Sequence, residues 1–173
     1  NDAVKQYTAV AQKWPDGEFA PHAQYGLGWT WFSIGEYQKA SIAMTALVNR
    51  YRTSSIQPQG LYVRAMAAYQ LGEYPASIKD VQSFLATKPK SDAALDAQYV
   101  MGLAQAGLKQ FDAATKTYAA ILAAADTYAA ADKVAYELGW AWIELGKTDK
   151  AVAVFHRLAK DWPNSPLAAE SLF

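Results

Sequence analysis

The chain has 173 residues, 16 basic and 16 acidic, so its formal net charge is zero, and it contains no cysteine. A neutral chain without a basic run lacks the positive field that phosphate binding needs, which argues against nucleic acid as a partner. The absence of cysteine excludes disulfides and thiolate metal sites. No apolar stretch approaches the roughly 18 uninterrupted residues of a membrane span, so we expect no direct membrane insertion.

Residues of one kind recur every 37 positions along the chain. Tyrosine occupies one column, small residues occupy a second, and large apolar residues occupy a third. The columns are Tyr25, Tyr62, Tyr99 and Tyr136; Ala40, Ser77, Ala114 and Ala151; and Met44, Val81, Tyr118 and Phe155. Several columns in one register, without insertion or deletion, indicate tandem repeats, and such repeats must stack to bury their apolar faces.

Each repeat is predicted to contain two helices joined by a tight turn. In the first repeat the helices are expected over about 20–34 and 37–51, because apolar residues recur at helical spacing there. Gly35 suits the left-handed residue that ends a helix, and Lys109 is the exception in its column. On the first helix, Leu27, Trp31 and Ile34 are predicted to face the hairpin core. The absence of alternating β-branched runs completes an all-α prediction.

The repeat register also predicts the organisation of the whole chain. We expect a single array over 1–173 with broken repeats at both ends. Residues 2–14 form the second helix of a truncated unit, 20–51, 58–88, 92–125 and 127–162 are four full units, and 165–173 start a further truncated unit. The opening at Asn1, without an initiator Met, fits a mature product or a piece of a longer array.

The pattern resembles that of tetratricopeptide repeat (TPR) proteins over nearly the whole chain. The likeness is carried by Gly28, Trp31, Ala40, Met44 and Leu47, and by prolines near the unit ends. The departures are a period of 37 instead of about 34 residues, and the loss of the proline at Arg52 and Asp126 and of the large residue at Ala68 and Gln105.

The longer period, with Trp-Pro-Asp and Trp-Pro-Asn-Ser links, resembles the repeats of bacterial cell-envelope TPR proteins. The Tol-Pal accessory protein and the outer-membrane assembly lipoprotein are of this type. The resemblance implies a right-handed α-solenoid of tandem antiparallel helix hairpins, whose first helices line a concave side. It also implies a bacterial periplasmic or outer-membrane location, and the cytoplasm is the alternative.

The first helices carry a second apolar face that is predicted to bind a partner. The residues of this face recur from repeat to repeat around the tyrosine column. They are Tyr25, Trp29, Phe32, Tyr62, Met66, Tyr69, Tyr99, Leu103, Tyr136 and Trp140. Tyrosine and tryptophan bury much area at low entropy cost, which favours a peptide-binding groove. The alternative is that the same residues pack between adjacent first helices and meet no ligand.

Catalysis finds no support in the residue pattern. His22 and His156 fall on different helix types, and no nucleophile with a base and an orienting group can be assembled. We expect no enzyme, no cofactor and no metal. The sequence favours a scaffold that binds a peptide or protein partner. The alternatives are a self-assembly module that forms homo-oligomers through its repeat ends, and an accessory domain of a larger enzyme or export machine.

Overall fold

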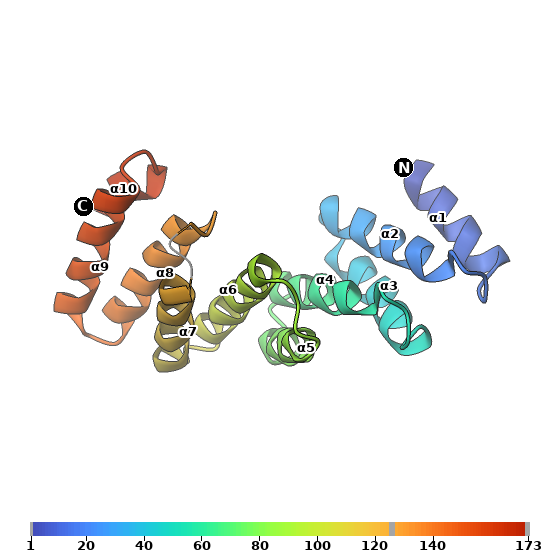
Figure 1. Ribbon diagram of the computed structural model, residues 1–173, viewed down its shortest axis with the longest axis horizontal. Coiled ribbons are helices and arrows are strands. Elements are labelled where there is room, and N and C mark those ends of the chain that lie inside the picture. Colours follow the sequence, from blue (N-terminus) through green and yellow to red (C-terminus); the bar gives the residue numbers. More distant parts are fainter. Residues whose placement is uncertain (1, 125–126, 172–173) are drawn as a thin grey trace. The chain divides into compact units, whose positions relative to one another are not determined.

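The computed structural model describes residues 2–124 and 127–171, and these form ten helices (Figure 1). The chain divides into two compact units, Asn1–Pro89 and Lys90–Phe173. The first unit contains α1 (Asp2–Lys13), α2 (Ala20–Ser33), α3 (Tyr37–Arg50), α4 (Gln57–Gln70) and α5 (Tyr74–Ala86). The second contains α6 (Ser91–Gly107), α7 (Phe111–Ala124), α8 (Ala131–Glu144), α9 (Thr148–Asp161) and α10 (Pro166–Glu170). The all-α prediction is confirmed for the described residues.

The second helices of the four hairpins begin one period of 37 residues apart, at Tyr37, Tyr74, Phe111 and Thr148. The division of the chain into two compact units leaves the single array over 1–173 as a prediction. The expected unit boundaries at 125 and 173 lie outside the described residues. α10 covers part of the last expected segment.

A left-handed residue closes every hairpin, as the glycine column predicts. Gly35, Gly72 and Gly146 have φ of 80°, 75° and 68°, and Lys109 keeps the same conformation at φ 59°. The next amide reaches back to the helix: Glu36 N donates to Trp31 O at 2.9 Å, and Gln110 N donates to Gln105 O at 2.9 Å. This Schellman geometry satisfies carbonyls that a helix end leaves unpaired.

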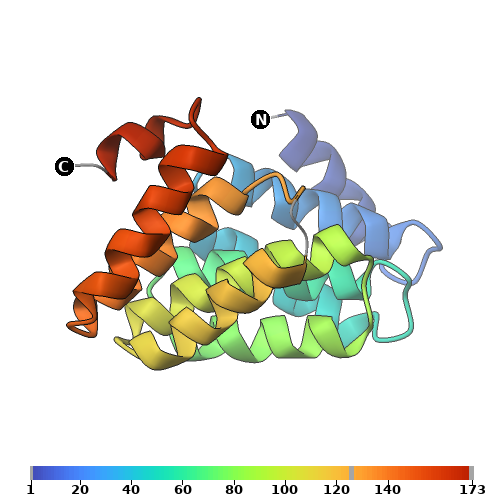
Figure 2. The same cartoon turned by 60° about the vertical axis from the view of Figure 1, so that its left-hand side comes forward.

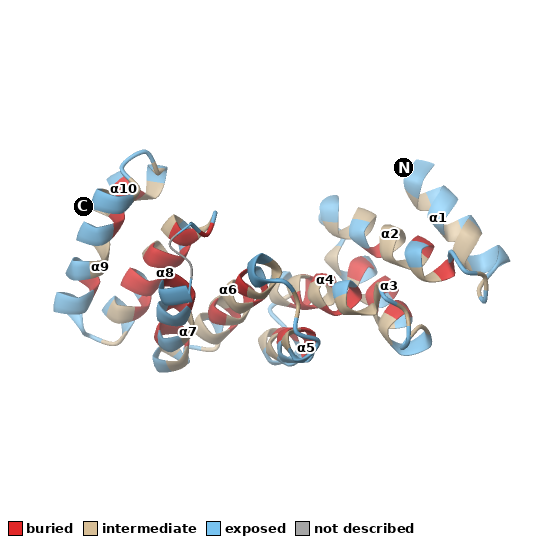
Figure 3. Cartoon of the chain, viewed as in Figure 1, coloured by how far each residue is buried: buried red, intermediate tan, exposed pale blue. Residues whose placement is uncertain are grey.

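Within each unit, consecutive helices pack on one another. In the first unit α2 lies against α1, α3 and α4, and α3 also lies against α4; in the second unit α8 lies against α6, α7, α9 and α10. Figure 2 shows α8 and α9 side by side as one hairpin. Buried residues lie mostly on α2 to α5 in the first unit and on α6 to α8 in the second, whereas α1 and most of α9 are exposed (Figure 3).

Small residues on the first helix of a hairpin pack against large side chains of its second helix. A Cβ atom at Gly28 would lie 2.6 Å from Met44 Cε, and at Gly139 it would overlap the Phe155 ring. This contact defines the core side of α2. The prediction that Ile34 joins the hairpin core is therefore wrong: Ile34 is 52% exposed, because it lies on the outer side of α2 together with the half-buried Leu27 and Trp31.

Candidate partner-binding surfaces

The predicted binding residues of the first repeat form an aromatic row along α2. Tyr25 stacks on Trp29 with ring centroids 6.5 Å apart, Trp29 stacks on Phe32 at 5.9 Å, and Phe32 meets Tyr37 of α3 at 5.4 Å. Trp29 is 43% exposed, while Tyr25 and Phe32 are half-buried. Burial raises the pKa of Tyr25 above its ordinary value. The row is therefore a preformed aromatic surface with the indole as its most exposed member.

The predicted residues of the next two repeats pack inward to a greater degree. The ring of Tyr62 lies 5.5 Å from Phe84 of α5, and that of Tyr99 lies 6.3 Å from Tyr118 of α7. Tyr69 similarly meets Tyr74, with ring centroids 5.9 Å apart. Met66 packs against the cluster of Met44, Leu47 and Val63, and Leu103 is half-buried. These residues support the hairpins and present only part of their surface outward.

The fourth repeat again exposes a tryptophan in the register position of Trp29. Trp140 is 46% exposed, and its ring lies 6.1 Å from Tyr136 and 6.2 Å from Phe155. Together with Ile143, which is 40% exposed, it forms one wall of a pocket of about 380 Å³ between α8, α9 and α10.

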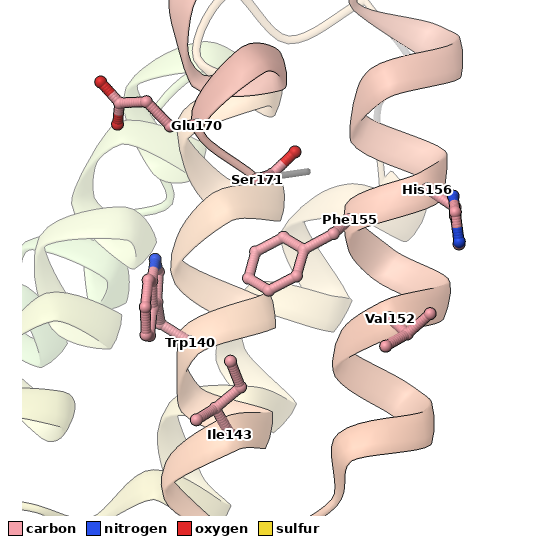
Figure 4. Close-up of a pocket in the computed structure, with 7 residues that line it drawn as sticks. All are labelled: Trp140, Ile143, Val152, Phe155, His156, Glu170 and Ser171. Atoms are coloured by element: carbon pink, nitrogen blue, oxygen red, sulfur yellow. The ribbon is translucent and has the colours of Figure 1, made fainter. Parts of the chain in front are cut away.

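Figure 4 shows the Phe155 ring pointing from α9 toward α8 within this pocket. The remaining lining residues are Val152, His156, Glu170 and Ser171. The Tyr136 hydroxyl donates to Glu170 Oε2 at 3.4 Å, which links the first helix α8 to α10. His156 is exposed on α9. The pocket thus combines an apolar floor with a carboxylate at its rim.

A second kind of hollow lies on the opposite side of the hairpins and was not predicted. On α2 and α3 it is apolar, lined by Leu27, Trp31 and the 63% exposed Ile42 among others. One period later it is polar: Arg64 Nε and Nη2 donate to Asp80 at 2.6 and 2.7 Å. A comparison of columns could have revealed the contrast, because Leu27 and Ala43 correspond to Arg64 and Asp80.

One column near the first-helix starts is polar in all four repeats. His22, Gln59, Asp96 and Lys133 are all exposed. Asp96 also has a structural role, because its Oδ1 accepts a hydrogen bond of 2.7 Å from the hydroxyl of the buried Tyr128. In the described part of the chain, no group of three His, Cys, Asp or Glu residues could hold a metal ion. No helix there is long and apolar enough to cross a bilayer.

Comparison with solved structures shows the TPR fold. The chain is similar to MamA protein, with a TM-score of 0.78 at 22% identity over 91% of this chain and 80% of the other. It is also similar to YrrB, described as a TPR protein with an unusual peptide-binding site, with a TM-score of 0.78 at 15% identity over 99% and 84% of the two chains. MamA from Desulfovibrio magneticus RS-1 matches with a TM-score of 0.76 at 15% identity over 96% and 98%.

These structures confirm the predicted TPR-like solenoid. No curated protein matches the chain. Among protein families, the match is to YfiO, outer membrane lipoprotein, and it extends over residues 20–173. All four helix hairpins fall within that range. The chain therefore belongs to the YfiO outer membrane lipoprotein family.

Proposed function

We propose that this chain is a non-catalytic scaffold that binds a peptide or protein partner through the exposed aromatic surface of its first helices. The main observation behind this proposal is the exposure of Trp29 and Trp140. They occupy the same register position three periods apart, and each is more than two-fifths exposed beside a tyrosine of the repeated column. Exposed indoles supported by neighbouring rings are typical anchors of protein interfaces.

The family and the solved relatives support this proposal from two sides. The YfiO family is one of outer membrane lipoproteins, which favours a place in the bacterial envelope. YrrB is described as having a peptide-binding site on the same fold. His156 lines one pocket with Glu170 and Ser171, but there the Ser171 hydroxyl donates to Ala168 O and the Glu170 carboxylate accepts from the Tyr136 hydroxyl. These bonds engage both groups elsewhere, which supports a non-catalytic role.

The test is capture of envelope proteins on the immobilised chain, quantified by mass spectrometry. Trp29→Ala and Trp140→Ala should each reduce recovery of a specific partner, and the double variant should abolish it. Asn49→Ala is the matched control, because Asn49 is an exposed residue on the second helix α3, outside the first-helix face. Circular dichroism should show unchanged helix content in all four variants. Equal recovery by the wild type and the double tryptophan variant would refute the proposal.

Trp29→Ala is a better probe than alanine at Tyr62 or Tyr99, because the Trp29 ring stacks on Tyr25 and Phe32 of its own helix. Both tyrosine rings contact a ring of the second helix in their own hairpin. Their removal would therefore weaken the hairpin and the surface together. Loss of capture by Tyr62→Ala alone could not separate binding from stability.

A further inference from the structure

The first helices of the two units differ in charge. Acidic residues gather on those of the second unit, α6 and α8, which carry Asp92, Asp96, Asp132, Glu137 and Glu144 against the one basic residue Lys133. α2 and α4 contain no carboxylate, and the guanidinium of Arg64 on α4 is already paired with Asp80. The two exposed tryptophans therefore lie in different electrostatic surroundings, because Trp29 belongs to α2 and Trp140 to α8.

Two carboxylates flank the indole of Trp140 on its own helix. Glu137 precedes it by three residues and Glu144 follows it by four, and side chains at these spacings lie on one face of a helix. The repeat equivalents of the two glutamates on α2 are Gly26 and Ser33, neither of which carries a charge. The indole on α8 is therefore bordered by negative charge that its counterpart on α2 lacks.

Within residues 2–124 and 127–171 these carboxylates form no ion pair. Glu137, Glu144 and, from α10, Glu170 take part in none of the ion pairs found there. Packing does not explain the half-buried Glu137, because its repeat equivalents include the buried Val63 and Val100, and burial raises the pKa of its carboxyl. An ionised carboxylate held partly away from water without a counter-ion is unfavourable. A cation supplied by a partner would offset this desolvation.

The cation that fits this surface is an amino-acid side chain. In the part of the chain that the structure describes, no group of three His, Cys, Asp or Glu residues is arranged to hold a metal ion. Lysine and arginine are attracted to the face of an exposed tryptophan ring as well as to carboxylates. This chain already contains such contacts: Lys39 Nζ lies 4.6 Å from the centroid of the Trp31 ring, and Lys150 Nζ lies 4.4 Å from that of Trp142.

We propose that the Trp140 surface binds a partner segment in which lysine or arginine stands beside an apolar residue. The basic group pairs with Glu137 or Glu144 and lies over the indole, and the apolar residue packs against Ile143, which is 40% exposed. The Trp29 surface, on a helix without carboxylates, does not select for basic residues. The proposal rests on the proposed function and names the chemistry of the segment that the second unit binds.

Three short fluorescein-labelled peptides are the probes, and they differ only in one repeated residue. Each repeats leucine, X and alanine, with lysine, glutamine or glutamate at X. Their binding to the intact 173-residue chain is followed by fluorescence anisotropy. The lysine peptide should bind at least about tenfold more tightly than the glutamine peptide at low salt, and the difference should shrink as salt screens the charges. The glutamate peptide should bind most weakly.

Variants of the chain assign this preference to the Trp140 surface. Glu137→Gln combined with Glu144→Gln keeps the size of both side chains and removes their charge, so the preference for lysine should fall to about twofold or less. Trp140→Ala should weaken binding of the lysine peptide by at least about fivefold. Glu36→Gln is the matched control, since Glu36 is an exposed glutamate that already pairs with Lys39 at 3.2 Å. It should leave the preference unchanged, and circular dichroism should show equal helix content in all variants.

Three results would overturn the proposal. They are equal binding of the lysine and glutamine peptides, the absence of saturable binding by the lysine peptide, and a lysine preference that survives the double glutamine variant. The last result would show a general attraction of the chain for cations. Capture of envelope proteins that still depends on Trp29 would uphold the proposed function in each of these cases, so the two failures can be told apart.

Discussion

Gly102 of α6 lies against the ring of Tyr118 of α7, and no side chain at position 102 could occupy that space without displacing the ring. The same pairing joins Gly28 to Met44 and Gly139 to Phe155. The second full repeat has Ala65 at the small position, and there the large position holds the smaller Val81. Size is therefore matched across each hairpin.

Gly102→Ala tests this match because two effects oppose one another. Alanine in a helix interior is favoured over glycine by about 1 kcal/mol. The clash with Tyr118 should reverse the sign and lower the free energy of unfolding by about 1–3 kcal/mol. Urea denaturation measures the change. Adding Tyr118→Val, the pair found at Ala65 and Val81, should recover part of the loss, and strictly additive effects would contradict the pairing.

Lys109 should be improved by glycine. Its φ of 59° places an ordinary side chain in the left-handed region that glycine occupies in the three sister turns. Lys109→Gly is expected to raise the free energy of unfolding by about 0.5–1 kcal/mol. The control is Lys116→Gly, since Lys116 is an exposed residue inside α7, and that change should lower stability by a similar amount. Thermal unfolding followed by circular dichroism distinguishes the two signs.

Removal of one partner of the bidentate Arg64–Asp80 ion pair should strongly lower the free energy of unfolding. The side chains are 19% and 9% exposed, so either partner left alone is a charge held away from water. Asp80→Ala is expected to lower the free energy of unfolding by about 3–5 kcal/mol. The double variant Arg64→Leu with Asp80→Ala copies Leu27 and Ala43 of the preceding repeat. It should recover most of the loss in urea denaturation, and an equally unstable double variant would contradict this interpretation.

Glu137 should make stability depend on pH. Desolvation by burial raises the pKa of this α8 carboxyl above its ordinary value. The protonated form is therefore favoured in the folded state, and its stabilising contribution is complete below the ordinary glutamate pKa. That contribution is lost as the pH rises through the raised folded-state pKa.

Replacement of Glu137 removes this titration. The residues in its column are Gly26, Val63 and Val100, so Glu137→Val fits the repeat pattern. We expect Glu137→Val to be more stable than the wild type at about pH 7 and to lose most of that advantage at about pH 4. Urea denaturation at both pH values measures the difference. An advantage that does not change with pH would show that hydrophobic packing alone explains it.

The sequence predicted best those features that depend on residues of a single hairpin. The starts of α3, α5, α7 and α9 follow the 37-residue register without deviation. The turn conformation follows from glycine, and it persists at Lys109 because the surrounding hairpin imposes it. Apolar spacing identified Ala40, Met44 and Leu47 as inward residues, and all three are fully buried.

Features that depend on several elements could not be predicted in the same way. Ile34 is apolar at the correct helical spacing, yet it faces outward, because spacing identifies a stripe without identifying the helix that covers it. The ion pair of Arg64 and Asp80 joins two helices in a hollow that only their packing creates. The pocket beside Phe155 depends on where α10 lies relative to α8 and α9.

The match between Gly102 and Tyr118 spans only sixteen positions of sequence, because both belong to one hairpin. Contacts between residues so close in the chain form with little loss of loop entropy, and proteins rich in them fold quickly. Each hairpin can therefore close before it meets its neighbours. A 37-residue segment carries its own turn and its own size match, so it can be duplicated or exchanged as a cassette without redesign of the segments beside it.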